Sequence, residues 1–197
     1  MRERILAYGQ PGTGKTTAHL SIAQAYPDAK FHIIDTDDSI ERMLSTEFRD
    51  LTNVQVYPAQ DFIECKEALT EIKQLAKDGD WLVVDMLDTV WDFVQGHYIQ
   101  EIFSQDTGSY FLQARKELKQ GASSLNALKG WTDWSVINRL YQEWINMICY
   151  QLPCHIFLTS KANRLNREDE TEIQDTFSPF GLKPEGEKRN LYRVHSV

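Results

Sequence analysis

The sequence contains no long hydrophobic run. No apolar stretch approaches the ~20 residues that a helix needs to span a bilayer, and the opening residues Met1 to Arg4 lead directly into a strand-like segment. No segment has the pattern of a secretory signal peptide. We therefore expect a cytoplasmic protein that does not associate with membranes.

Cysteine is also scarce. The three cysteines, Cys65, Cys149 and Cys154, are odd in number, lie among apolar residues and form no C-x-x-C pair. This pattern favours reduced core cysteines over a disulfide or a zinc site.

Basic residues are outnumbered by acidic ones. Lys and Arg total 21 against 29 Asp and Glu, which gives a net charge of -8. Proteins that bind duplex DNA without sequence preference use many Lys and Arg contacts to phosphates, so the composition argues against that class. A local basic groove stays compatible with this composition, because net charge does not describe how charge is distributed.

The remaining composition is typical of one globular domain. With 197 residues, 42% of them hydrophobic, the chain can fill one core but is too short for two ordinary domains. Short apolar runs predict strands at residues 4–8, 30–35, 53–57, 81–85, 155–159 and 191–197, and helical spacing predicts helices at 15–26, 62–76, 88–103, 111–119 and 137–148. This alternation predicts a single α/β domain over residues 1–197, with a mostly parallel sheet covered on both faces.

Two regions fit this pattern less well. Residues 104–130 mix Gly, Ser and Asp with one short helical stretch, and we expect an insertion or a loop there. Residues 163–190 are polar and include the turn Ser178-Pro179-Phe180-Gly181, so we expect a flexible loop or a hairpin.

The first loop carries the most specific motif in the chain. The pattern G-x-x-x-x-G-K-[ST] is matched in full by Gly9, Gln10, Pro11, Gly12, Thr13, Gly14, Lys15 and Thr16. Glycines allow successive backbone N–H groups to point at phosphates, and the start of the following helix attracts anions. We expect ATP to bind from Gly9 to Thr17, with Lys15 on the β- and γ-phosphates and Thr16 on Mg²⁺. Thr17 fits either the nucleotide site or helix packing.

An acidic residue ends a strand that we expect to be buried. Trp81-Leu82-Val83-Val84-Asp85 places one carboxylate after four apolar residues. Such a strand end faces the crevice where ligands bind in open α/β sheets, and a phosphate loop needs a second acid for its metal. We expect Asp85 to bind Mg²⁺, directly or through water, and Asp88 to cap the next helix.

More carboxylates follow the strand at residues 30–35. Asp35, Asp37 and Asp38 crowd this strand end, with Ser39 after them. We expect Asp38 or Ser39 to cap a helix that begins at Ile40. Asp35 and Asp37 both fit a base that orients the attacking water.

Together these motifs resemble the ATPase core of the RecA superfamily. The resemblance implies a RecA-like α/β/α fold of the P-loop NTPase class and Mg²⁺-dependent ATP hydrolysis. It also implies that Asp37, two places after the strand-end acid, activates water. The usual residue is Glu, which is one methylene longer than Asp37. In such proteins a polar residue after the late strand senses the γ-phosphate, and Thr159, Ser160 and Lys161 occupy that place.

Three further stretches resemble core-only, phage-encoded RecA-like ATPases linked to single-strand annealing and recombination. These are V-V-D-M-L-D-T-V-W at residues 83–91, W-x-x-I-N-x-x-Y from Trp134 to Tyr141, and K-P-E-G-E-K at residues 183–188. The resemblance implies single-stranded DNA as a partner, a homo-oligomer in a ring or filament, and, for a phage protein, the host cytoplasm.

Cations for the γ-phosphate are few in the core. A neighbour's cation is commonly worth ~10³–10⁵ in rate, and in RecA-like ATPases a late hairpin supplies it across the subunit interface. Lys188 and Arg189 end such a loop here, and we predict that Lys188 is catalytic in this way. An ordinary exposed hairpin is the alternative.

Two other functions stay open. A P-loop small-molecule kinase would use an Arg-rich lid, for which Arg164, Arg167, Arg189 and Arg193 are available, but the acidic run at residues 168–172 opposes it. A nucleotide-dependent switch, or an ATPase subunit for packaging or replication, would use the same phosphate loop.

Overall fold

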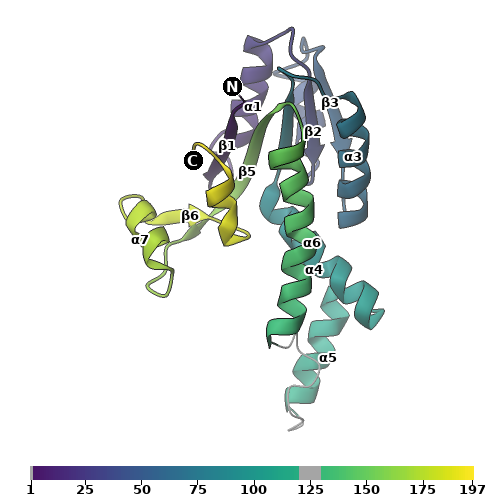
Figure 1. Ribbon diagram of the computed structural model, residues 1–197, viewed down its shortest axis with the longest axis vertical. Coiled ribbons are helices and arrows are strands. Elements are labelled where there is room, and N and C mark those ends of the chain that lie inside the picture. Colours follow the sequence, from purple (N-terminus) through teal and green to yellow (C-terminus); the bar gives the residue numbers. More distant parts are fainter. Residues whose placement is uncertain (1, 120–129) are drawn as a thin grey trace.

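Five parallel strands form the centre of the computed structural model, which describes residues 2–119 and 130–197 (Figure 1). The strands are β1 (Arg4–Gly9), β2 (Phe31–Asp35), β3 (Val54–Pro58), β4 (Trp81–Asp85) and β5 (His155–Arg164). Their order across the sheet is β1-β5-β4-β2-β3. Because they are parallel, the carboxyl ends of β1, β5 and β4 lie next to one another at one edge.

Helices cover both faces of this sheet. The helices up to residue 151 are α1 (Lys15–Ala25), α2 (Ile40–Leu44), α3 (Phe62–Leu75), α4 (Leu87–Phe103), α5 (Thr107–Lys119), α6 (Gly130–Asn146) and the π-helical turn η1 (Met147–Gln151). Residues of α1 and α2 pack against one face, and residues of α3, α4 and α6 pack against the other.

Strand β4 shows why a nearly continuous apolar run was needed. Trp81 and Val83 belong to the apolar cluster under α1, whereas Leu82 and Val84 belong to the cluster under α3, α4 and α6. Side chains of a strand alternate between faces, so a strand buried on both faces reads as apolar throughout. The predicted three-layer α/β/α fold with a mostly parallel central sheet is confirmed.

The region 104–130, which we expected to be an insertion or a loop, contains helix α5. The Asp106 carboxylate accepts a hydrogen bond from the Ser109 N–H at 2.9 Å, as a helix cap does. Tyr110 on α5 contacts the ring of Phe103 at the end of α4, with 4.6 Å between centroids. Residues 120–129 of this region lie outside the described residues.

The end of the chain departs from its predicted strand. Strand β6 (Leu182–Pro184) pairs antiparallel with the end of β5, and helix α7 (Thr171–Phe177) lies between them in the chain, which gives the C-terminal hairpin that we expected. Beyond it a 3₁₀-helix, η2 (Lys188–Arg193), occupies part of the stretch that we predicted as a strand at 191–197. That prediction was wrong except for one isolated bridge between Ser196 and Ile5.

Buried polar groups explain why η2 replaces a strand. The Glu187 side chain accepts a hydrogen bond from the Arg189 N–H at 3.1 Å and so caps the helix. Asn190 and Arg193 are both buried, and residues three apart lie on one side of a 3₁₀-helix. The Asn190 amide donates to the Tyr141 hydroxyl on α6 at 2.8 Å. The stretch therefore buries a polar face, which an apolar reading of its sequence misses.

The structure also describes the cysteines and the apolar content of the helices. Cys65, Cys149 and Cys154 are buried and free of disulfides, as predicted. Within residues 2–119 and 130–197, no helix is long and apolar enough to cross a membrane.

Candidate nucleotide site

The phosphate loop connects β1 to α1 and has the backbone that its glycines permit. Gly12 and Gly14 have φ angles of 77° and 85°, in the left-handed region that favours glycine. At Gly9 an added Cβ would collide with the Thr13 hydroxyl. Gly14 is the N-cap of α1 and provides no side-chain cap. The loop and the first N–H groups of α1 therefore form a surface suited to an anion.

Lys15 lies over this loop. Its ammonium donates to the carbonyl of Gly9 at 3.0 Å and to that of Gln10 at 3.2 Å. The Gln10 carbonyl also accepts from the Thr13 hydroxyl at 2.8 Å, and the Gln10 side chain donates to the Ala162 carbonyl on β5 at 3.3 Å. The loop is thus tied to its neighbouring strand, and it holds one cation at its centre.

Thr16 and Asp85 meet although 69 residues separate them. The Thr16 hydroxyl donates to Asp85 Oδ2 at 2.9 Å. His19, on the same face of α1, contacts the same oxygen at 3.1 Å, and the Thr159 hydroxyl on β5 donates to Asp85 Oδ1. The start of α1 and the neighbouring strand β5 therefore converge on one fully buried carboxylate at the end of β4.

The surroundings of Asp85 favour its charged form. Burial opposes ionisation, but the contacts with His19, Thr159 and Thr16 together lower the pKa of Asp85 below its ordinary value. A buried carboxylate is tolerated only when it is paired or hydrogen-bonded. Asp85 can therefore present negative charge at the edge of the phosphate loop.

The donor set fits a magnesium ion with a bound triphosphate. A carboxylate and a hydroxyl oxygen are the ligand types that Mg²⁺ takes, and it usually adds water and substrate phosphates to one or two protein ligands. Across the described part of the chain, no group of three or more His, Cys, Asp or Glu side chains could hold a metal ion.

The acids after β2 have different positions. Asp35 is buried, and its carboxylate accepts from the backbone N–H groups of Asp37, Ser39 and Ile40 at 3.3, 3.4 and 3.1 Å. Ser39 occupies the N-cap position of α2, as expected, but it makes no side-chain cap bond; the Asp35 carboxylate accepts from the first N–H groups of this helix instead. Asp37 is exposed at the same strand end.

Asp88 also differs from its predicted role. The N-cap of α4 is Met86, and Asp88 lies within the first turn. Asp88 Oδ1 accepts from the Lys161 N–H at 3.0 Å, and Oδ2 pairs with the Lys161 ammonium at 3.2 Å. The pair links the start of α4 to the carboxyl end of β5.

The segment at and after β6 lies against β5 at the same edge of the sheet. The Ser160 hydroxyl donates to the Glu185 carbonyl at 2.8 Å, and the Glu185 N–H donates to the Lys161 carbonyl at 2.8 Å. Lys188 follows, with its ammonium 3.3 Å from Glu170 in a pair whose side chains are more than half exposed.

Thr17 lies on α1 and is half-buried.

His19 and the Asp88–Lys161 pair are the residues that sequence reasoning missed. His19 follows Thr16 by three residues, which places both on one helix face, but a single histidine in a helix carries no specific signal. Asp88 resembled a cap because it stands at the expected start of a helix. Only the strand order reveals what faces these side chains.

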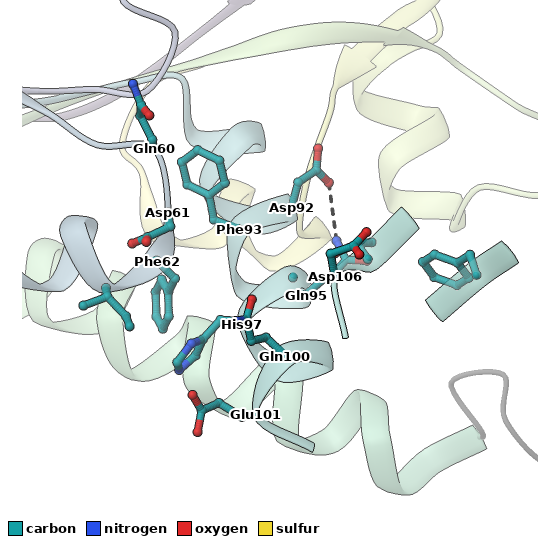
Figure 2. A pocket seen from close by; sticks show the side chains of 14 residues that line it. Gln60, Asp61, Phe62, Asp92, Phe93, Gln95, His97, Gln100, Glu101 and Asp106 are labelled. Carbon is teal, nitrogen blue, oxygen red and sulfur yellow. Dashed lines mark hydrogen bonds between the residues drawn. The ribbon is translucent and has the colours of Figure 1, made fainter. Parts of the chain in front are cut away.

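A separate cavity of about 730 Å³ lies between the start of α3 and helices α4 and α5. Figure 2 shows its acidic and aromatic lining, with Asp92 and Gln95 joined by a hydrogen bond. No phosphate-loop residue lines it. The cavity is therefore distinct from the nucleotide site.

Comparison with known proteins agrees with this geometry. A family model described as AAA domain (AAA_24) matches residues 1–189. The chain belongs to this AAA domain family. The solved structures that are similar to this AAA domain include the crystal structure of the RadB recombinase, with 13% identity and a TM-score of 0.49 over 96% of this chain and 71% of that one. No curated protein matches the chain. Similarity at this level does not extend to function.

Proposed function

We propose that this AAA domain protein is a RecA-like, Mg²⁺-dependent ATPase. The observation that carries the proposal is the 2.9 Å hydrogen bond between Thr16 and Asp85. It joins the helix of the phosphate loop to the one acid that ends β4, and these two oxygens would hold Mg²⁺ beside the phosphates. Bound Mg²⁺ would neutralise charge on the terminal phosphates during hydrolysis.

Other residues of the site would bind the phosphates, orient the attacking water and stabilise the transition state. The loop from Gly9 to Thr17 would bind the phosphates, and Lys15 would exchange its two carbonyl contacts for phosphate oxygens. Asp37, exposed beside Asp35, would orient the attacking water, because the oxygens of Asp35 are already used by backbone N–H groups. Lys188 would act on the triphosphate of a neighbouring subunit. Its pair with Glu170 is largely exposed, and such pairs contribute little and exchange easily.

The biological setting that we propose is DNA recombination or single-strand annealing, with single-stranded DNA as partner and a ring or filament as the working form. The support is the resemblance of residues 83–91, 134–141 and 183–188 to phage recombination ATPases. With a net charge of -8, binding to DNA would need a local surface rather than the whole protein.

ATP turnover with and without single-stranded DNA tests this proposal. We expect Mg²⁺-dependent release of phosphate that single-stranded DNA accelerates more than duplex DNA of equal length. Light scattering on the same samples should show an assembly larger than a monomer. Binding of ATP with no turnover under any of these conditions would instead support a nucleotide-dependent switch, and turnover that requires a metabolite would support a kinase.

A further inference from the structure

His19 is a buried polar side chain to which the proposed function gives no role. It lies on α1 with none of its side chain exposed, and its Nε2 is 3.1 Å from Asp85 Oδ2. A charged carboxylate only accepts, so Nε2 carries the hydrogen of this bond. The imidazole also packs against the ring of Phe157 on β5 in an edge-to-face arrangement, with 5.8 Å between centroids. His19 therefore directs one N–H at Asp85 from a fixed position in the core.

This histidine is costly as a packing residue. Its other ring nitrogen, Nδ1, is buried and has no hydrogen-bond partner among the residues that the structure describes. Burial of a polar atom without a partner costs free energy, and an apolar side chain would fill the same place without that cost. The contact with Asp85 is what distinguishes a histidine from such a side chain here.

Thr16 and His19 share Oδ2 of Asp85 but differ in their relation to the metal. The Thr16 hydroxyl donates to this oxygen at 2.9 Å, and Thr16 is also the proposed ligand of Mg²⁺. His19 is three residues later, about 4.5 Å farther along the helix axis, and is fully buried. Its bond to Asp85 can therefore stay unchanged whether or not the Thr16 oxygen binds the ion.

The second oxygen of Asp85 has a donor of its own. The Thr159 hydroxyl donates to Oδ1, so rotation of the carboxyl group would break at least one hydrogen bond. Carboxylates that bind metals are commonly held by such partners, and loss of one partner costs about 10–100-fold in metal affinity or activity. The phosphate-loop pattern includes Thr16, and the late-strand pattern includes Thr159, but neither pattern includes His19.

We propose that His19 is a positioning residue of the metal site, whose Nε2–H holds the Asp85 carboxylate in one orientation for Mg²⁺. The inference rests on the proposed function, because it assumes that Thr16 and Asp85 bind Mg²⁺ beside a nucleotide. His19 itself touches neither the nucleotide nor the ion. Its effect should therefore appear in the Mg²⁺ dependence of nucleotide binding and be absent from binding without the metal.

Calorimetry with a non-hydrolysable ATP analogue at increasing Mg²⁺ concentration measures this effect without turnover. His19→Leu removes the donor and keeps an apolar side chain. In this variant the Mg²⁺ concentration that gives half of the gain in affinity should rise about 10–100-fold. Affinity for the analogue with the metal chelated should be unchanged. His19→Gln carries an N–H at a similar reach and should keep most of the wild-type Mg²⁺ dependence.

His32→Leu is the matched control. His32 is also buried, its Nδ1 contacts the Tyr57 hydroxyl at 3.3 Å, and its Nε2 has no partner within the described residues. In the sheet register it pairs with Leu82, three residues before Asp85. Loss of this imidazole should affect packing as loss of His19 does, but the Mg²⁺ dependence of His32→Leu should equal that of the wild type.

Proton NMR of the wild type gives a second test that needs no substitution in the protein under observation. The Nε2–H of His19 should give a signal protected from exchange with water, identified by its absence from the spectrum of His19→Gln. This signal should persist when Mg²⁺ and the analogue are added together. Its loss on that addition would show that His19 releases Asp85, and would overturn the proposal.

The outcomes separate the inference from the function on which it rests. A wild type that does not bind the analogue, or binds it equally well without Mg²⁺, would refute the proposed metal and nucleotide site. Mg²⁺-dependent binding by the wild type, with the same Mg²⁺ dependence in His19→Leu, would refute only the role of His19. Equal shifts in His19→Leu and His32→Leu would also overturn it, because they would indicate a loosened core.

Discussion

The buried carboxyl of Asp35 should make the folded protein less stable as the pH rises. Burial raises the pKa of Asp35 to about 6, although backbone N–H groups of Ile40 and Asp37 act in the opposite direction. In the unfolded chain an Asp has a pKa of about 3.9. The folded protein therefore binds this proton more strongly, and the stability that it contributes is complete below pH 4 and is lost as the pH rises through 6.

The size of the effect follows from the two pKa values. A difference of about 2 pH units corresponds to about 3 kcal/mol in the free energy of unfolding. Asp35→Asn removes the titrating group, so its stability should lack this term. Denaturant unfolding of both proteins at pH 4, 5, 6 and 7 measures it. We expect the free energy of unfolding of the wild type, relative to the variant, to fall by about 2 kcal/mol between pH 4 and pH 7, because the unfolded carboxyl is already half ionised at pH 4.

Asp38→Asn is the control for this experiment. Asp38 is exposed in the same loop with a φ angle of 56°, a conformation that Asn adopts readily. The variant changes the same charge without touching the buried carboxyl, and its pH dependence should follow that of the wild type. Parallel pH profiles for the wild type and Asp35→Asn would refute the reasoning, and would reopen Asp35 as the base that activates water.

Three further predictions concern the site itself. Asp37→Asn should keep ATP and Mg²⁺ binding but lose about 10²–10⁴-fold in turnover, the usual worth of a general base; turnover at the wild-type rate would exclude Asp37 as that base. Asp85→Asn should raise the Mg²⁺ concentration needed for half-maximal turnover, and an unchanged Mg²⁺ titration would contradict its role as metal ligand. Lys188→Ala should cut turnover without cutting binding, and mixing it with Asp37→Asn should restore activity at mixed interfaces. Specific activity that does not depend on protein concentration, with no rescue on mixing, would show that each subunit completes its own site.

The sequence alone predicted the phosphate loop and the acidic strand end, because each combines a motif with a recognisable strand. The spacing of Gly9, Gly14 and Lys15 has few structural solutions, because it needs a left-handed residue such as Gly14 between a strand and a helix. Asp85 could be found because four apolar residues predict a strand buried on both faces, which fixes where its end must lie. These two features place most of the candidate site from the sequence alone.

The missed features depend on contacts between distant segments. His19 contacts Asp85, and Asp88 pairs with Lys161, because the strand order β1-β5-β4 brings these distant residues together. Residues 191–197 looked like a strand because Leu191 and Val194 are apolar, yet the buried groups that decide the structure there are polar. A local pattern does not reveal a polar partner on another helix, such as Tyr141 for Asn190.

Binding of ATP to Lys15→Ala tests the central claim most directly. The ammonium of Lys15 lies at the centre of the phosphate loop, on the carbonyls of Gly9 and Gln10. Calorimetry with ATP and Mg²⁺ should show binding to the wild type and to the control Lys30→Ala, whose lysine is exposed before β2. It should show no measurable binding to Lys15→Ala, with the fold intact by circular dichroism. Unchanged ATP affinity in a folded Lys15→Ala protein would contradict nucleotide binding at this loop.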